Sequence, residues 1–143
     1  MATVAQGLSA SMEDYLEAIF LLVRERQQAR SSEIARRLGV KRASVTGALR
    51  ALKERGLVHY QPYGAVTLTA EGKTVAGRIT RRHVALRDFM VNVLSIDAAE
   101  AEDAACRMEH GIPKSVVDRL IDFADFVQTC PRAGAQWVDG FGY

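Results

Sequence analysis

Cysteine and long apolar runs are scarce in this chain of 143 residues. It has only two cysteines, Cys106 and Cys130, which could form at most one bridge. That number does not suit a disulfide framework, and reduced thiols are expected. No apolar run approaches the roughly 18 to 20 residues of a bilayer span, and the first residues lack the basic and apolar regions of a signal peptide. We therefore expect a cytoplasmic protein with no membrane partner.

The common signatures of catalysis are also missing. The sequence contains no HExxH arrangement, no nucleophile elbow and no glycine-rich phosphate loop. A small metal hydrolase that uses Glu109 as its base is therefore a weak alternative, and we expect neither an enzyme nor a small organic substrate. With 48% hydrophobic and 25% charged residues, the chain can bury one core that is divided into two small lobes.

The charge is distributed unevenly along the chain. Residues 24–55 hold ten Lys or Arg against three Glu, whereas residues 88–125 hold nine acids against three bases. A basic first half suits a polyanion, and an acidic second half suits cations. Two ordinary solvated faces would produce the same counts, so the distribution needs support from motifs.

The first half has the pattern of a winged helix-turn-helix. Apolar residues at helical spacing predict a helix that Ser11 caps, a short helix that Ser31 or Ser32 caps and Gly39 ends, and a third helix closed by Gly56. The alternating, β-rich segment after Gly56 predicts a two-stranded wing with its turn at residues 62–64.

The second half is predicted to be helical. Val75, Ile79, Leu86, Met90 and Val93 define one face of a long helix after Thr69. A fifth helix is capped by Ser95 or Asp97 and ended by Gly111, and a sixth, with Pro113 in its first turn, has an apolar face of Val116, Val117, Leu120, Ile121 and Phe123 or Phe126. The predicted architecture is mostly α, with a winged helix-turn-helix domain at 8–70, a helical domain at 71–128 and an irregular tail at 129–143.

The third helix has the residues of a DNA-reading helix. A helix in the major groove reads bases through small or cationic donors near its N-terminal end, while flanking bases neutralise phosphates. We expect Lys41, Arg42, Ser44, Thr46 and Arg50 to face DNA, with Arg36, Arg37 and Lys53 beside them. The wing tip could add Tyr60, Gln61 or Tyr63. A three-helix scaffold for protein contacts is the alternative.

Three segments carry residues of the types that bind metal ions in proteins. On a helix, Cys106, Glu109 and His110 stand at i, i+3 and i+4 and leave one face. Asp14 and Glu17 form an i, i+3 pair opposite the apolar stripe of the first helix, although a capping role also explains Asp14. His83 lies on a helix face whose other residues are apolar and expected to be buried. The alternative to a metal ligand there is a hydrogen-bonded core histidine. Together these six residues could hold one six-coordinate ion or a close pair of ions.

Four segments carry a resemblance to a known family. "SMEDYLEAIF", "IARRLGVKRASVTGALRALKERGLV", "LTAEGKTVAGRITRRH" and "ACRMEHGIP" resemble the diphtheria-toxin-repressor family of metal-dependent transcription regulators over residues 8–125. The short length, without a C-terminal SH3-like domain, resembles the manganese-transport-regulator branch. The resemblance implies a homodimer whose winged helix binds palindromic operator DNA and whose helical half makes the dimer contact.

The resemblance also assigns a ligand set. The family's metal ligands fall at the positions of Asp14, Glu17, His83, Cys106, Glu109 and His110. By resemblance, we expect a repressor that controls genes of metal uptake or homeostasis.

This ligand set mixes the two branches of the family. The manganese branch has a carboxylate at the position of Cys106, and the iron branch usually has a methionine at the position of Asp14. A thiolate favours Fe(II), Co(II) or Zn(II) over Mn(II), while the two carboxylates of the first helix restore oxygen character. We expect Fe(II), with Mn(II) a close alternative and Zn(II) or Co(II) able to substitute in vitro. Arg87 stands where the iron branch has a ligand of its ancillary metal site, and an arginine cannot bind a metal ion there. Glu102 remains available as an outer ligand.

A second hypothesis needs no metal. A winged-helix regulator could sense oxidation through Cys106 or Cys130. The family explains no role for Cys130, and a packed thiol is the simpler interpretation.

Overall fold

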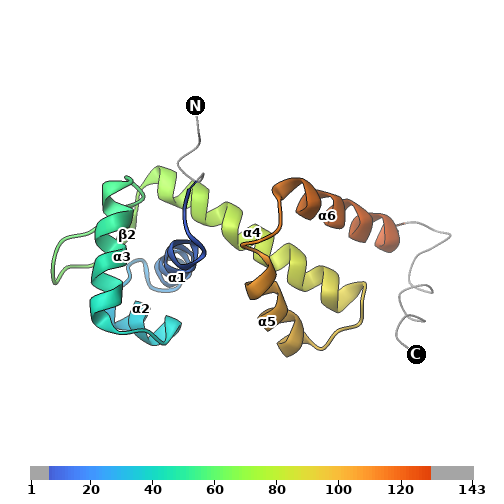
Figure 1. Ribbon diagram of the computed structural model, residues 1–143, viewed down its shortest axis with the longest axis horizontal. Coiled ribbons are helices and arrows are strands. Elements are labelled where there is room, and N and C mark those ends of the chain that lie inside the picture. Colours follow the sequence, from blue (N-terminus) through green and yellow to red (C-terminus); the bar gives the residue numbers. More distant parts are fainter. Residues whose placement is uncertain (1–6, 130–143) are drawn as a thin grey trace. The chain divides into compact units, whose positions relative to one another are not determined.

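The computed structural model describes residues 7–129 and divides into two units (Figure 1). The N-terminal unit ends at Ile79, and the C-terminal unit begins at Thr80, inside the helix α4 (Ala70–Asn92). The predicted tail from residue 130 on, with Cys130, lies outside the described residues. The mostly helical architecture, a winged helix-turn-helix followed by a helical unit, is confirmed.

Three helices form the N-terminal unit together with a small sheet: α1 (Ala10–Arg26), α2 (Ser31–Leu38) and α3 (Arg42–Glu54). The predicted cap at Ser11 is wrong, because Ser9 has the extended backbone of an N-cap and its Oγ accepts a hydrogen bond from Met12 N at 3.2 Å. Asp14 therefore stands beyond the first turn, and a capping box no longer explains it.

The turn between α2 and α3 follows from two local features. Arg30, not Ser31 or Ser32, is the N-cap of α2, because the Glu33 carboxylate reaches back and accepts from Arg30 N at 3.1 Å. At the other end Gly39 adopts a left-handed φ of 65°, which ends the helix as predicted. The chain then enters α3 within three residues.

The wing is a two-stranded antiparallel sheet of β1 (Val58–His59) and β2 (Thr67–Leu68), with Val58 opposite Leu68. Tyr63 lies between the strands with a left-handed φ of 62°, and its side chain is fully exposed. Tyr60 differs from the expectation of an exposed wing contact, because its ring belongs to the buried core and only 8% of the residue is accessible.

One core holds the N-terminal unit together. Its largest fully buried members come from all three helices and from the segments beside the sheet: Leu16, Ile19, Ile34, Val45, Leu49, Leu52, Leu57 and Val66.

The first turn of α4 lies close to the backbone of the segment before β1. Thr69 Oγ1 accepts from Gly72 N at 2.9 Å and donates to Gly56 O at 2.7 Å, and a Cβ on Gly72 would meet the carbonyl oxygen of Leu57. Only glycine fits there.

The C-terminal unit contains the second part of α4, α5 (Ala98–Met108) and α6 (Lys114–Thr129). All five residues of the predicted apolar face are buried; four of them lie in α4, and Val93 directly follows its last residue. Asp97 caps α5 by accepting from Ala99 N at 3.0 Å. The helix ends at Met108 rather than at Gly111, because the chain tightens into a turn in which Gly111 N donates to Met108 O.

Most residues of the predicted apolar face of α6 are exposed in the single chain. Val117 is buried, but four other members are exposed: Val116 (46%), Ile121 (37%), Phe123 (44%) and Phe126 (57%). We call these four residues the α6 apolar face. None of the helices between residues 7 and 129 combines the length and apolarity that a bilayer span requires.

Candidate metal centre and nucleic-acid interface

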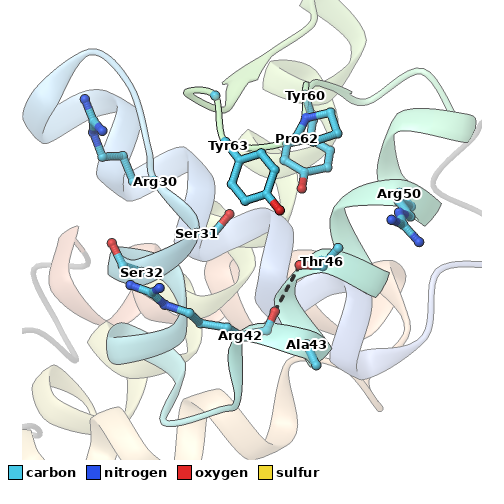
Figure 2. Close-up of a pocket in the computed structure, with 11 residues that line it drawn as sticks. Arg30, Ser31, Ser32, Arg42, Ala43, Thr46, Arg50, Tyr60, Pro62 and Tyr63 are labelled. Atoms are coloured by element: carbon cyan, nitrogen blue, oxygen red, sulfur yellow. Dashed lines mark hydrogen bonds between the residues drawn. The ribbon is translucent and has the colours of Figure 1, made fainter.

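A groove lies between the start of α2, the exposed side of α3 and the wing turn (Figure 2). Its volume is about 450 Å³. Three arginines, Arg30, Arg42 and Arg50, line it together with hydroxyl and small residues: Ser31, Ser32, Ala43, Thr46, Tyr60, Pro62, Tyr63 and Gly64. None of these described lining residues is acidic, so the groove carries uncompensated positive charge.

A second hollow of the N-terminal unit is different. It is lined by Leu22, three arginines and two glutamates, and the acids neutralise two of the arginines. Arg37 Nη1 and Nη2 both lie 3.2 Å from Glu25 Oε1, and Arg26 pairs with Glu33. A polyanion gains most where basic groups have no acidic partner, so the first groove is the better candidate interface.

The structure sorts the predicted DNA-binding residues into three groups. Arg42, Thr46 and Arg50 line the groove, and Thr46 Oγ1 donates to the Arg42 carbonyl oxygen at 3.2 Å. Lys41, Ser44 and Lys53 are exposed at the two ends of α3, outside the groove lining. Arg36 and Arg37 lie at the second hollow.

Sequence reasoning missed the groove residues Arg30, Ser31 and Ser32, which were considered only as capping candidates or as part of the basic segment. The feature that could have identified them is their position in the sequence. They stand at the N-terminal end of α2, and this end of the helix lines the groove together with the wing turn.

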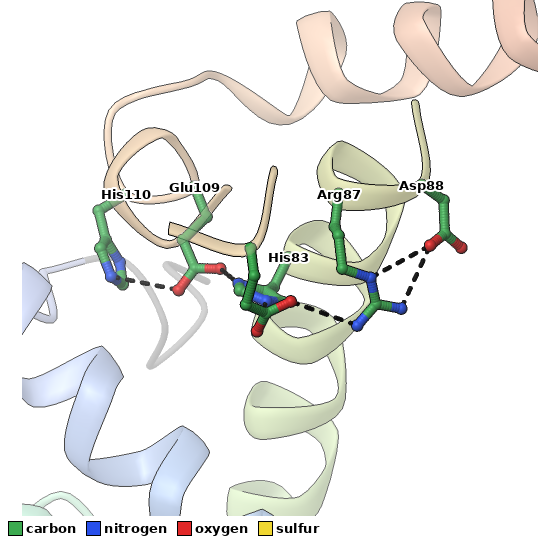
Figure 3. A network of polar contacts seen from close by, with 6 residues as sticks. His83, Arg87, Asp88, Glu109 and His110 are labelled. Carbon is green, nitrogen blue, oxygen red and sulfur yellow. Dashed lines mark hydrogen bonds and ion pairs between the residues drawn. The ribbon is translucent and has the colours of Figure 1, made fainter. Parts of the chain in front are cut away.

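The C-terminal unit gathers imidazole groups around the Glu109 carboxylate (Figure 3), with the thiol of Cys106 also close by. The Glu109 side chain is fully buried, and His83 Nδ1 lies 2.7 Å from its Oε2. His110 Nε2 lies 3.3 Å from its Oε1, and Cys106 Sγ lies within 4.8 Å of a Glu109 carboxylate oxygen. We call His83, Cys106, Glu109 and His110 the Glu109 cluster. All four were predicted as ligands, and α4, α5 and the turn after α5 position them.

The contacts of His83 favour its protonated form. The pKa of His83 is raised from 6.5 to about 9, chiefly by the hydrogen bond to Glu109, against the lowering effect of burial and with the hydrogen bond to Glu102 contributing to the rise. Both ring nitrogens lie 2.7 Å from a carboxylate oxygen, and only the imidazolium donates from both nitrogens.

The other side of His83 is an ion-pair network. His83 Nε2 contacts Glu102 Oε1, and Glu102 Oε2 accepts from Arg87 Nη1 at 3.4 Å. Arg87 also donates to Asp88 Oδ1 at 3.2 Å. Sequence reasoning singled out Arg87 and Glu102 but not this chain of contacts.

The two remaining predicted ligands, Asp14 and Glu17, belong to the N-terminal unit. They stand one helical turn apart on α1, and both are half-buried. That placement leaves their carboxylates on one side of the helix, while Leu16 and Ile19 supply its fully buried side.

The residues of the Glu109 cluster fit a divalent transition metal. Glu109 Oε1 is buried and has no hydrogen-bond partner among residues 7–129, although His110 Nε2 lies 3.3 Å away. A buried carboxylate oxygen without a donor is costly, and a cation relieves that cost. Imidazole, carboxylate and thiolate together are a borderline donor set, which suits Fe(II), Co(II) or Zn(II) and accommodates Mn(II) through its oxygens.

The fold and the two candidate sites define the class as a winged helix-turn-helix protein with a metal-ligand cluster. Two family models match it: "Iron dependent repressor, N-terminal DNA binding domain" over residues 7–66, and "Iron dependent repressor, metal binding and dimerisation domain" over residues 69–137. The chain belongs to this family of transcriptional regulators, which is the diphtheria-toxin-repressor family, and it resembles the manganese-regulator branch.

Individual relatives agree with this assignment. An uncharacterised HTH-type transcriptional regulator of Methanocaldococcus jannaschii is 34% identical over 82% of this chain and 95% of its own length. The HTH-type transcriptional regulator MntR of Shouchella clausii is 36% identical over 82% of both chains. A solved manganese-dependent transcriptional repressor in complex with manganese has 33% identity and a TM-score of 0.73 over 82% of this chain. The match spans about half, 54%, of that solved chain.

Proposed function

We propose that this protein is a metal-dependent repressor that binds palindromic operator DNA as a homodimer and controls genes of metal uptake or homeostasis. The observation that carries the proposal is the Glu109 cluster, in which a fully buried carboxylate contacts two imidazoles and has a thiol close by. A buried arrangement of that kind is costly without a cation, and it lies in a chain whose other unit has an acid-free arginine groove.

The proposed ligands are Asp14, Glu17, His83, Cys106, Glu109 and His110. A divalent ion supplies positive charge for buried carboxylates and a link between residues on different helices. Glu109 and His83 provide the buried part of the ligand set, and Asp14 and Glu17 contribute carboxylates from α1. Ligands from both units would make ion binding and the placement of the DNA-binding unit interdependent.

Fe(II) is the ion that we favour, with Mn(II) a close alternative. The thiolate of Cys106 supports Fe(II), whereas the other five predicted ligands are carboxylates or imidazoles that also suit Mn(II). The family description names iron and the solved repressor is described with manganese. Zn(II) and Co(II) are expected to substitute in vitro.

Duplex DNA is the proposed macromolecular partner. Arg42, Thr46 and Arg50 would face the major groove from α3, and Arg30 with the serines that follow it would contact phosphates. Two half-sites on one face of B-DNA lie roughly 34 Å apart, so a homodimer must hold its two α3 helices at that separation.

The α6 apolar face supports the homodimer. Large apolar side chains that stay exposed on one helix are typical of an interface, and the matching family model is described as a dimerisation domain. We propose that a second copy of this chain covers it.

Fluorescence anisotropy with a palindromic operator tests the proposal. Affinity is measured under anaerobic conditions with chelator and with Fe(II), Mn(II) and Zn(II) separately. We expect at least one ion to raise the affinity by about 5- to 150-fold, the usual range of allosteric coupling. Glu109→Ala should abolish the response while far-UV circular dichroism stays helical. An affinity that ignores all three ions would contradict the proposal.

A second candidate is a regulator that senses oxidation through Cys106. The exposure of this residue favours it. Cys106→Ser separates the two functions. A retained metal response with a lost peroxide response would favour oxidation sensing, and a weakened response to Fe(II) would favour the metal ligand.

A further inference from the structure

His83 faces two carboxylates of different character. Its Nδ1 lies 2.7 Å from Glu109 Oε2 (Figure 3), and its Nε2 lies 2.7 Å from Glu102 Oε1. Glu109 is fully buried, whereas the Glu102 side chain is 53% exposed. A metal-bound imidazole gives one nitrogen to the ion and donates a hydrogen bond from the other. When the ion binds, one of the two ring nitrogens must therefore become its ligand, and the other keeps its hydrogen bond to a carboxylate.

Charge distinguishes the two sides. The remaining members of the Glu109 cluster lie on the Nδ1 side, and one Glu109 oxygen there has no hydrogen-bond donor within the described part of the chain. On the Nε2 side, Arg87 Nη1 lies 3.4 Å from Glu102 Oε2, and the same guanidinium donates to Asp88. A guanidinium stays charged at all relevant pH values, and it repels a second cation at close range. The ion is therefore expected on the Nδ1 side.

We propose that Glu102, anchored by Arg87, is the outer carboxylate that holds His83 in its Nε2–H form and leaves Nδ1 to the metal ion. This inference rests on the proposed function, since it concerns the same metal centre. Glu102 and Arg87 are positioning residues. Glu102 accepts the Nε2 proton, and Arg87 fixes the direction of the Glu102 carboxylate.

Two features of the geometry support this assignment. The Glu102 carboxylate uses one oxygen for His83 and the other for Arg87, so neither oxygen needs to leave its partner when the ion is bound. Arg87 and His83 stand one turn apart on α4, while Glu102 comes from α5. The contact therefore also fixes the imidazole ring against a second helix, which reduces the freedom that a ligand loses on binding.

Nuclear magnetic resonance tests the form of His83 directly. The full chain is labelled with ¹⁵N-histidine and loaded with Zn(II), which is diamagnetic, and long-range ¹H–¹⁵N correlations are recorded. His59→Gln and His110→Gln assign the signals. We expect a protonated Nε2 and a metal-shifted Nδ1 for His83. Protonated Nδ1 with Nε2 on the metal would overturn the inference.

Metal affinity provides the second measurement, by competition of Zn(II) with a chromophoric chelator. Glu102→Ala should weaken binding by about 10- to 100-fold, as removal of an outer carboxylate does elsewhere. Glu102→Gln keeps an acceptor oxygen and should lose less. The matched control is Glu100→Gln, which removes one charge from an exposed residue of the same helix.

The outcomes separate the inference from the proposed function. If Glu102→Ala and Glu100→Gln weaken binding equally, Glu102 acts only through its charge and the inference is wrong, while the metal function stands. If the unmodified chain binds no Zn(II), Fe(II) or Mn(II), both are wrong. Circular dichroism of each variant shows that the helices are retained.

Discussion

The Nδ1 atom of His83 lies 2.7 Å from Oε2 of Glu109, a carboxylate with no exposed surface. An imidazolium at His83 supplies positive charge to Oε2, whereas the buried Oε1 has no hydrogen-bond donor among the described residues. A metal ion at the same place must displace the imidazolium proton, because only a deprotonated ring nitrogen can ligate. Proton and metal are therefore competitors for one position, and the metal-free protein should be sensitive to pH there.

Stability of the metal-free protein should fall at alkaline pH. The pKa of His83 is raised from 6.5 to about 9, chiefly by Glu109, with Glu102 adding to the effect. Because the folded pKa is the higher one, the stabilisation is fully present below about pH 6.5 and is lost as the pH rises through about 9. At about 1.4 kcal/mol per pKa unit, the loss is at most about 3.5 kcal/mol. Urea unfolding with chelator from pH 6 to 10 measures it.

The control for this pH effect is His83→Gln, which should flatten the decline, whereas His59→Gln, at an exposed strand position, should leave it unchanged. His110 and Arg87 face the same carboxylates. His110→Gln shows whether the second imidazole contributes. A decline of equal size in His83→Gln would assign the pH dependence to other groups.

Gly72 should not tolerate alanine. A Cβ there would lie 1.9 Å from the carbonyl oxygen of Leu57, a backbone atom that cannot rotate away, and the Thr69 cap of α4 would have to shift. We expect Gly72→Ala to lower the free energy of unfolding by more than about 1 kcal/mol. Gly77→Ala on the same helix meets nothing within 4 Å and should be neutral or stabilising by up to about 1 kcal/mol. Urea denaturation compares the two, and equal effects would contradict the close approach.

The fold was largely predictable because its local signals are strong. The stripe from Val75 to Val93 has helical spacing, and Gly39 supplies the left-handed residue at the sharp turn. Helix starts were less predictable, because several residues near each start can cap and the backbone selects one of them. Ser9 rather than Ser11 is the N-cap of α1, because its Oγ accepts from Met12 N. Arg30 is the N-cap of α2, because its backbone N–H donates to the Glu33 carboxylate.

The residues of the candidate sites could be predicted from the sequence, but the contacts between their side chains could not. Spacing and resemblance named the members of the Glu109 cluster, yet the helix ends at Met108, so Glu109 and His110 reach the cluster from a turn. Pairings such as Arg37 with Glu25 join residues of different helices, and helical periodicity within one segment contains no information about them. For the same reason, the exposed position of Phe126 could not be distinguished from a buried one.

Arg50 and Arg37 should contribute unequally to DNA binding. Arg50 lines the acid-free groove, whereas Arg37 is held by Glu25. Arg50→Ala should weaken operator binding and reduce the slope of log K against log salt by about 1, as loss of one phosphate contact does. Arg37→Ala should change the slope less, because breaking the Glu25 pair offsets the gain from a phosphate. Anisotropy titrations across a salt series measure both slopes. Equal slopes would mean that Glu25 does not compete with DNA.

The α6 apolar face should be necessary for the homodimer. Phe126 is 57% exposed in the single chain, and burying it against a second copy would contribute apolar area to the interface. Phe126→Glu places a charge in that interface, and we expect a monomer in light scattering at a concentration where the unmodified chain is dimeric. Val40→Glu is the matched control, because Val40 is an exposed apolar residue, at 37%, of the N-terminal unit. A dimer that survives Phe126→Glu but not Val40→Glu would place the interface on the N-terminal unit.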